Sequence, residues 1–183
     1  MHDDFIEFVR RPSQETFLAV RQQLLESEEF DPTDDALHRI DRLLFEERYE
    51  EAGQAIAEAM PNFLLSPRMH LMIAYLAEKQ NDEEARDTER YIASACCAGI
   101  ESTGDGTMES PYRVMRPADE YDMLDFLGLE FKNQAMVADG QRRLDVIHCA
   151  DGTQVFFDIT ELVSPEDGVS EFTYEPHDDG HED

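Results

Sequence analysis

Positive charge is scarce in this sequence, since 15 lysines and arginines stand against 43 aspartates and glutamates, for a net charge of −28. Only two of the bases, Lys79 and Lys132, are lysines. A field of that sign repels phosphates, so binding to nucleic acid is disfavoured. The acidity fits three explanations: solubility or adaptation to a salty cytoplasm, a basic protein partner, or cation binding. Of the partner classes, we expect a basic protein, no nucleic acid and no membrane.

Cysteine and long apolar runs are too few to indicate a secreted or membrane protein. Cys96, Cys97 and Cys149 do not make a disulfide framework. No run reaches the roughly 20 apolar residues of a membrane span, and the acidic N-terminus is too short for a signal peptide. The apolar content of 41% still allows a buried core. We expect a soluble, cytoplasmic protein with one domain or two small ones.

Catalytic signatures are missing as well. The chain has no Gly-rich phosphate loop, nucleophile elbow, Cys-x-x-Cys pair or HExxH helix. We therefore predict no cofactor and assign no catalytic or cofactor-binding residue. A non-enzymatic role is the better supported expectation.

Residues 1–100 carry the apolar spacing of amphipathic helices. Apolar residues recur three and four positions apart in four segments between residues 34 and 99. Pro61 is expected to stop one of these helices, and Gly99 to cap the last. The short turns between the segments predict antiparallel helical hairpins.

A short repeat supports the hairpins. The sequence RYEEA at residues 48–52 recurs 33 residues later as NDEEA at residues 81–85. It resembles the turn, and the small residue near the start of the second helix, in the tetratricopeptide repeat, whose period is 34 residues. The family's aromatic and glycine on the first helix are missing. The resemblance covers residues 34–99 and implies a small stack of helical hairpins.

These hairpins are the expected binding surface. We predict a protein-interaction or regulatory module whose concave, acidic groove receives a basic partner, with His38, Arg42, His70 and Tyr75 as candidate partner-binding residues. One alternative is an acidic inhibitor or immunity-type protein that masks a basic partner.

The second half of the chain has a mixed pattern. Residues 101–111 are rich in Gly, Ser and acids and form a predicted linker or loop. Residues 112–170 contain a helix that begins at Pro117, followed by three β-prone runs separated by two Asp-Gly pairs. Residues 171–183 are predicted to be a disordered acidic tail. The expected fold is α+β, with helical hairpins packed against a helix and a three-stranded antiparallel meander.

Treating each Asp-Gly pair as a two-residue turn fixes the register of the meander. In that register one face is apolar and covered by the preceding helix. Its expected members are Phe131, Ala135, Val137, Leu144, Val146, Val155, Phe157 and Ile159.

On the other face Asp145 would lie directly opposite Asp158. Like charges across a ladder are unfavourable, so either Lys132 and Arg143 neutralise them or the two carboxylates hold a cation or a basic side chain. An enzyme or metal-dependent module that uses Asp145 and Asp158, with His148 as an optional third residue, is therefore a further alternative. Two carboxylates alone are a weak metal signal, because a hard cation takes six or more oxygens.

Three short motifs in residues 112–162 resemble a bacterial family known only as a domain of unknown function. They are Glu120-Tyr121 on the helix, Leu144-Asp145-Val146 on one strand and Phe157-Asp158-Ile159 on the next. The resemblance implies a shared fold and no activity.

Overall fold

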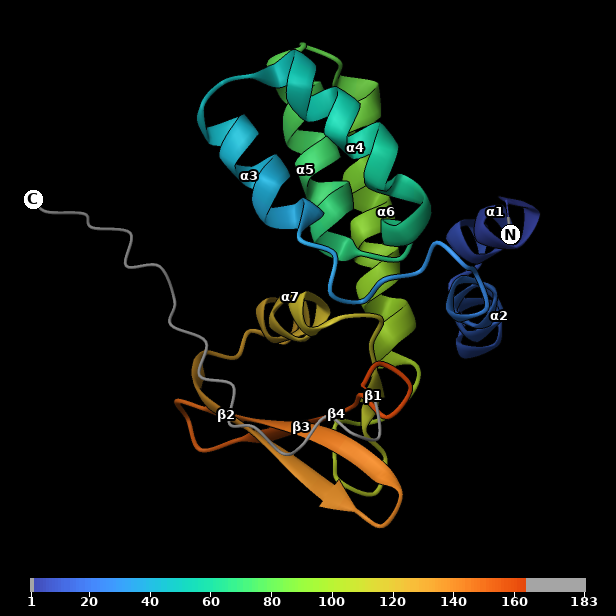
Figure 1. The fold of residues 1–183 in the computed structure, drawn as a ribbon, viewed down its shortest axis with the longest axis vertical. Helices are drawn as coiled ribbons and strands as arrows, with labels where there is room; N and C mark the ends of the chain where they lie inside the picture. Colours follow the sequence, from blue (N-terminus) through green and yellow to red (C-terminus); the bar gives the residue numbers. More distant parts are fainter. Residues whose placement is uncertain (1, 164–183) are drawn as a thin grey trace, which may run out of the picture.

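The computed structural model describes residues 2–163, and these residues form an α+β fold. Figure 1 shows helices α3 to α6 at one end, the sheet at the other, and helix α7 between them. Helices α1 and α2 lie to one side of α6. The predicted acidic tail, residues 171–183, lies outside the described residues.

The helices are close to those predicted. Their bounds are α1 His2–Arg10, α2 Gln14–Leu25, α3 Ala36–Phe45, α4 Tyr49–Phe63, α5 Pro67–Lys79, α6 Glu83–Glu101 and α7 Pro117–Leu127. Two expected ends are wrong, because α4 continues past Pro61 to Phe63 and α6 continues past Gly99 to Glu101. Gly99 is instead buried where α6 meets Phe17 and Phe8, with no room for a Cβ.

The turns of the two hairpins, α3–α4 and α5–α6, have the same backbone conformation. Glu47 and Asn81 both adopt positive φ, at 57° and 61°. The next amide closes each helix end, with Arg48 donating to the Leu43 carbonyl and Asp82 to that of Ala77, both at 2.9 Å. The equivalent turn residues, Glu47 and Asn81, are 34 positions apart. The structural repeat is therefore one residue longer than the 33-residue spacing of the two similar sequence segments.

The sheet has four strands and is mixed, so the expectation of a three-stranded antiparallel meander is wrong. Its strands are β1 Tyr112–Arg113, β2 Phe131–Asp139, β3 Arg142–Cys149 and β4 Gln154–Asp158, in the order β1-β4-β3-β2. Strands β2, β3 and β4 are antiparallel neighbours. The short strand β1 adds to β4 in parallel and makes the sheet mixed.

The first hairpin turn differs from the expected one without changing the faces. Asp139 pairs with Arg142, which leaves Gly140 and Gln141 as the two loop residues. Gly140 has a positive φ of 60° and Gln141 does not, as in a type II′ turn. The expected pairing of Ala135 with Leu144 is therefore displaced by two residues, and Ala135 pairs with Val146. An even displacement keeps the side chains from Asn133 onward on their expected faces. The register shifts between Phe131 and Asn133, so Phe131 pairs with Cys149 and does not lie on the face of Leu144 and Val146, where it was predicted.

The second turn contains one residue more than expected, and this reverses the faces of β4. The Cys149 amide donates to the Thr153 carbonyl at 2.8 Å, so the loop has three residues, ending in Gly152 with φ 92°. Asp145 consequently pairs with Phe157, and Leu144 pairs with Asp158. The predicted pairing of Asp145 with Asp158 is wrong. So is the single apolar face, because Val155 and Phe157 now share a face with Asp145 rather than with Leu144 and Val146.

The buried apolar residues form two clusters. One joins α1, α2, the C-terminal part of α6, α7 and the helix-facing side of the sheet, and includes Phe17, Ile100 and Phe157. The other fills the space among α3, α4 and α5, and includes Ile40 and Met69. The two N-terminal helices thus share a core with the sheet and with the end of α6, whereas α3 and α4 pack in the other cluster.

Residues 101–111 fold back onto the sheet. Asp105 and Gly106 both donate to the Ser110 carbonyl, and the Phe156 amide of β4 donates to the Gly106 carbonyl at 2.9 Å. No helix in the described part of the chain has both the length and the apolar character needed to cross a membrane.

Candidate functional site

Helix α7 carries a concentration of buried carboxyl groups. Proline at its first position and acids in its first turn favour a helix start after Arg116. Because the helix lies between the sheet and the hairpins, most of its polar positions are enclosed. Asp119 and Glu120 are both 0% exposed, and Asp122 is 5% exposed.

Glu120 faces the sheet, where a glutamine joins it to Asp145. The Gln134 Nε2 group on β2 donates to Glu120 Oε2 at 3.0 Å and to Asp145 Oδ2 at 2.8 Å. The Tyr121 hydroxyl donates to Gln134 Oε1 at 2.6 Å. The amide of Gln134 is thus fully used between two carboxyl groups and a phenol. Glu120 Oε1 is buried with no N–H or O–H donor among the described residues.

This arrangement favours a proton on the carboxyl pair. Burial, followed by the charge of Asp145 and a hydrogen bond to it, raises the pKa of Glu120 well above its ordinary value. Burial also raises the pKa of Asp145, against the hydrogen bonds from Gln134 and Glu120. A proton held on Glu120 gives the second carboxyl group a donor and removes the repulsion between two buried charges.

Asp119 faces the other way, toward Arg116 and the hairpins. Its Oδ2 accepts from the Met115 amide at 2.9 Å. Burial raises the pKa of Asp119 to about 7, although Arg116 opposes the shift. Arg116 is itself only 3% exposed. Its guanidinium group donates to the Asn62 carbonyl at 2.6 Å, and its Cζ atom lies 3.7 Å from the centre of the Phe63 ring.

Asp122 joins α7 to the start of α5. Its two oxygens accept from the Arg68 backbone amide at 3.1 Å and from Arg68 Nε at 2.8 Å. Burial raises the pKa of Asp122, and the bonds to Arg68 partly offset the rise. The three acids therefore fix α7 to three parts of the structure: the segment that precedes the helix, the sheet and α5.

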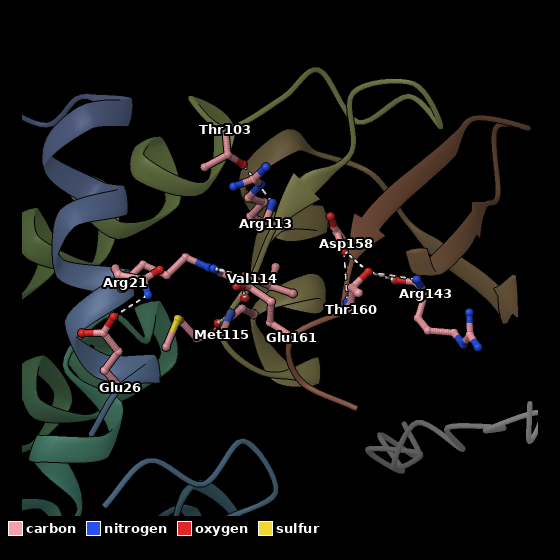
Figure 2. A network of polar contacts seen from close by, with 12 residues as sticks. Arg21, Glu26, Thr103, Arg113, Val114, Met115, Arg143, Asp158, Thr160 and Glu161 are labelled. Atoms are coloured by element: carbon pink, nitrogen blue, oxygen red, sulfur yellow. Dashed lines mark hydrogen bonds and ion pairs between the residues drawn. The ribbon is translucent and has the colours of Figure 1, made fainter. Parts of the chain in front are cut away.

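Asp158, the predicted partner of Asp145, has a different role. Its Oδ1 accepts from the Thr160 amide at 3.0 Å and from the Thr160 hydroxyl at 2.6 Å, and the Arg143 amide donates to that hydroxyl oxygen at 2.9 Å (Figure 2). Asp158 thus shapes the chain as it leaves β4. His148, the third member of that hypothesis, pairs with Asn133 and Gln154 on the face away from α7.

A second buried arginine fixes α2 to the chain around the sheet. Arg21 is 3% exposed and donates to Glu161 at 2.6 Å and to the Val114 carbonyl at 3.3 Å, as Figure 2 shows. Within residues 2–163, no group of three or more His, Cys, Asp and Glu side chains is placed to hold a metal ion.

Of the four predicted partner-binding residues, three are exposed and one is buried. His38 and Arg42 are exposed on α3, and Tyr75 is 40% exposed on α5. His70 is 1% exposed, with Nδ1 2.6 Å from Glu89 and Nε2 3.0 Å from the Leu64 carbonyl. Because His70 fills an interior position between helices, it does not present its ring to a partner.

Sequence reasoning missed the central members of the carboxyl cluster. The register predicted from the two Asp-Gly pairs puts Gln134 on the same face as Asp145, and in the structure the two residues do share a face. That face, however, is the one that α7 covers. The signal available in the sequence was the density of acids in the segment ADEYD, which is too high for a helix that covers a sheet with an ordinary apolar stripe.

The comparisons with known proteins give one match. The model of the family described as Domain of unknown function (DUF4919) matches residues 20–167. This range includes the helical hairpins as well as the sheet, and is wider than the resemblance over residues 112–162. The tetratricopeptide resemblance has no family match. Neither the curated proteins nor the solved structures contain a match.

Proposed function

The chain belongs to the DUF4919 family, whose description names no activity, and we propose that it is a non-enzymatic protein-binding module that takes a basic partner on its helical hairpins. The observation that carries this proposal is Phe45, which is 88% exposed at the end of α3. An exposed phenylalanine in an otherwise strongly charged surface is a candidate apolar anchor for a partner.

Phe45 belongs to a surface that we term the α3–α5 stripe. Each of the two helices contributes exposed residues at helical spacing, namely His38, Arg42 and Phe45 on α3 and Leu71, Tyr75 and Lys79 on α5. The Lys79 Nζ atom lies 4.8 Å from the centre of the Tyr75 ring. The stripe thus combines aromatic and aliphatic area with a few polar groups, a composition common at protein interfaces.

The acids lie around Phe45 rather than along the stripe. Glu46 and Glu47 follow it directly in the turn and are exposed. The one base of the turn, Arg48, is held by Glu46 at 2.7 Å and by Glu51 at 2.6 Å. A partner that places an apolar side chain on Phe45 and basic groups over this turn would match both features, and the net charge of −28 would speed its approach.

Affinity capture with the full chain as bait tests the proposal. The wild-type chain should retain a basic protein at low salt and less of it at moderate salt, since screening weakens exposed charge contacts. The double variant F45A/Y75A should lose that protein. The matched control F126A/M108A removes two exposed side chains, 43% and 37% exposed, that lie outside the stripe and should retain it.

The proposal fails if the wild-type chain retains no protein at either salt concentration, or if F45A/Y75A retains the same protein as the control. An acidic inhibitor is the second candidate, favoured by the same charge. It predicts that the retained partner is an enzyme whose activity falls in proportion to the added chain, whereas a scaffold leaves that activity unchanged.

A further inference from the structure

The surface between the end of α7 and the start of β2 contains a hollow of about 440 Å³, which lies apart from the α3–α5 stripe. This α7–β2 hollow is lined by aromatic and aliphatic side chains and by two carboxylates, from Tyr121, Leu124, Asp125, Leu129, Glu130 and Phe131. Its volume lies within the range of about 300–1,000 Å³ typical of small-molecule sites. Gly128 lies on its rim, where an added Cβ would meet no atom within 4 Å.

The aromatic wall suits a flat cation. The rings of Tyr121 and Phe131 have centroids 5.5 Å apart and planes inclined at 52°. A cation that lies over the face of either ring, within about 6 Å of its centre, would be attracted by that π-system. Guanidinium groups stack on aromatic faces more readily than ammonium groups do, because they are planar and weakly hydrated.

The charges around the hollow have one sign. Asp125 and Glu130 are exposed and belong to its lining, and none of the described residues that line it is basic. Behind the aromatic wall, the Tyr121 hydroxyl donates to Gln134, which in turn bonds the buried carboxyl groups of Glu120 and Asp145. A carboxylate can accept two parallel hydrogen bonds from a guanidinium group, so Asp125 and Glu130 in the lining also favour that cation.

We propose that the α7–β2 hollow binds a guanidinium group carried on an apolar stem. The stem lies against Leu124 and Leu129, the planar head lies against the two rings, and Asp125 and Glu130 accept its N–H groups. An arginine side chain of a protein and a free alkylguanidine both have this chemistry.

Nitrogen–proton NMR spectra of the full chain provide the test, with three probes added in turn. N-acetylarginine amide represents the side chain within a protein, n-butylguanidine represents a free guanidine, and N-acetylcitrulline amide is the uncharged match of the first. Both guanidines should give saturable shifts at the amides of Gly128, Leu129 and Phe131. Citrulline should bind at least about fivefold more weakly, because it lacks the charge that the acids and rings attract.

Variants separate a local site from the general attraction of an acidic protein for cations. The double variant D125N/E130Q should weaken N-acetylarginine amide by about five- to tenfold. The control E50Q/E84Q removes the same amount of charge from exposed positions on α4 and α6 and should leave the affinity within about twofold. Phe131→Leu keeps an apolar wall and should still weaken binding by about threefold.

Three results would overturn the proposal: no saturable shift with either guanidine, equal binding of citrulline, or equal losses in the two double variants. If n-butylguanidine binds and N-acetylarginine amide does not, the ligand is a free guanidine. If both bind, the hollow admits an arginine of a partner. None of these results depends on the α3–α5 stripe, so the proposed function is tested separately.

Discussion

Glu120 on α7 and Asp145 on β3 share one amide group, since Gln134 Nε2 donates to both carboxyl groups, at 3.0 and 2.8 Å. Glu120 is fully buried and Asp145 is 7% exposed. The pair lies in a part of the structure that is usually apolar, the contact between a helix and the sheet beneath it. Its protonation therefore couples the packing of α7 to pH.

The first prediction concerns stability in alkaline solution. Because the folded-state pKa of Glu120 is raised, the folded chain holds a proton that the unfolded chain releases. The contribution of Glu120 to stability is fully present below its unfolded pKa and is lost as pH rises through the folded pKa. Asp119, with a folded pKa of about 7, adds a loss of the same sign between its unfolded value of 3.8 and neutrality.

Glu120→Gln isolates this effect, because the amide resembles the protonated acid. We expect the variant to exceed the wild type in free energy of unfolding by about 1–3 kcal/mol near pH 8 and to differ little near pH 5. Guanidinium denaturation at both pH values measures this. Glu109→Gln, at an exposed position, should change the free energy of unfolding equally at the two pH values. Equal effects of Glu120→Gln at the two pH values would contradict a protonated Glu120.

The second prediction concerns the close contact of α6 with the N-terminal helices. A Cβ at Gly99 would lie 2.4 Å from Phe17 Cδ2 and 3.0 Å from Phe8 Cε2. Gly99→Ala should therefore reduce the free energy of unfolding by about 1–3 kcal/mol through overpacking.

Gly53→Ala is the matched control, since its Cβ would meet only Leu76, at an ordinary 3.5 Å. That variant should be stabilised by about 0.5–1 kcal/mol, because alanine is the better helix former. Thermal denaturation of both variants gives the comparison. A stable Gly99→Ala chain would mean that α1 and α2 can move away from α6 at little cost.

The third prediction concerns Arg116, which links the sheet half to the hairpins. Its guanidinium group donates to the Asn62 carbonyl and lies against Phe63. Arg116→Ala should cost about 1.5–3 kcal/mol for the charged hydrogen bond, and more for the lost packing. Arg113→Ala, at an exposed position on the neighbouring strand β1, should cost less than about 0.5 kcal/mol. Similar costs for the two variants would show that Arg116 does not fix this contact.

The fourth prediction concerns thiol reactivity. Cys96, Cys97 and Cys149 are free and buried, and burial raises the pKa of Cys97 to about 12. Burial also raises the pKa values of the other two thiols. Since only the thiolate reacts with disulfide reagents, the native chain should show almost no labelling by Ellman's reagent, and all three thiols should react in denaturant. Rapid reaction of one thiol in the native chain would contradict the described burial.

Much of the fold could be predicted from local patterns. The α+β class, the two helical hairpins, the start of α7 at Pro117 and the two reversals near the Asp-Gly pairs follow from apolar periodicity and turn chemistry. Residues 111–115 are compatible with a brief strand in the sequence, but the parallel pairing of β1 with β4 could not be predicted, because two residues carry no period. Its hydrogen bonds depend on where β4 lies.

The candidate sites depended on tertiary structure. The sequence by itself determined the charge of the chain, the acids of α7, and the shared face of Gln134 and Asp145. It did not determine that the turn after Cys149 has three residues, and strand periodicity makes a single residue enough to move Phe157 from one face of β4 to the other. Only the packing of α7 decided that Asp145 is enclosed beside Glu120 while Asp158 binds Thr160, because burial depends on what covers a strand and not on the strand itself.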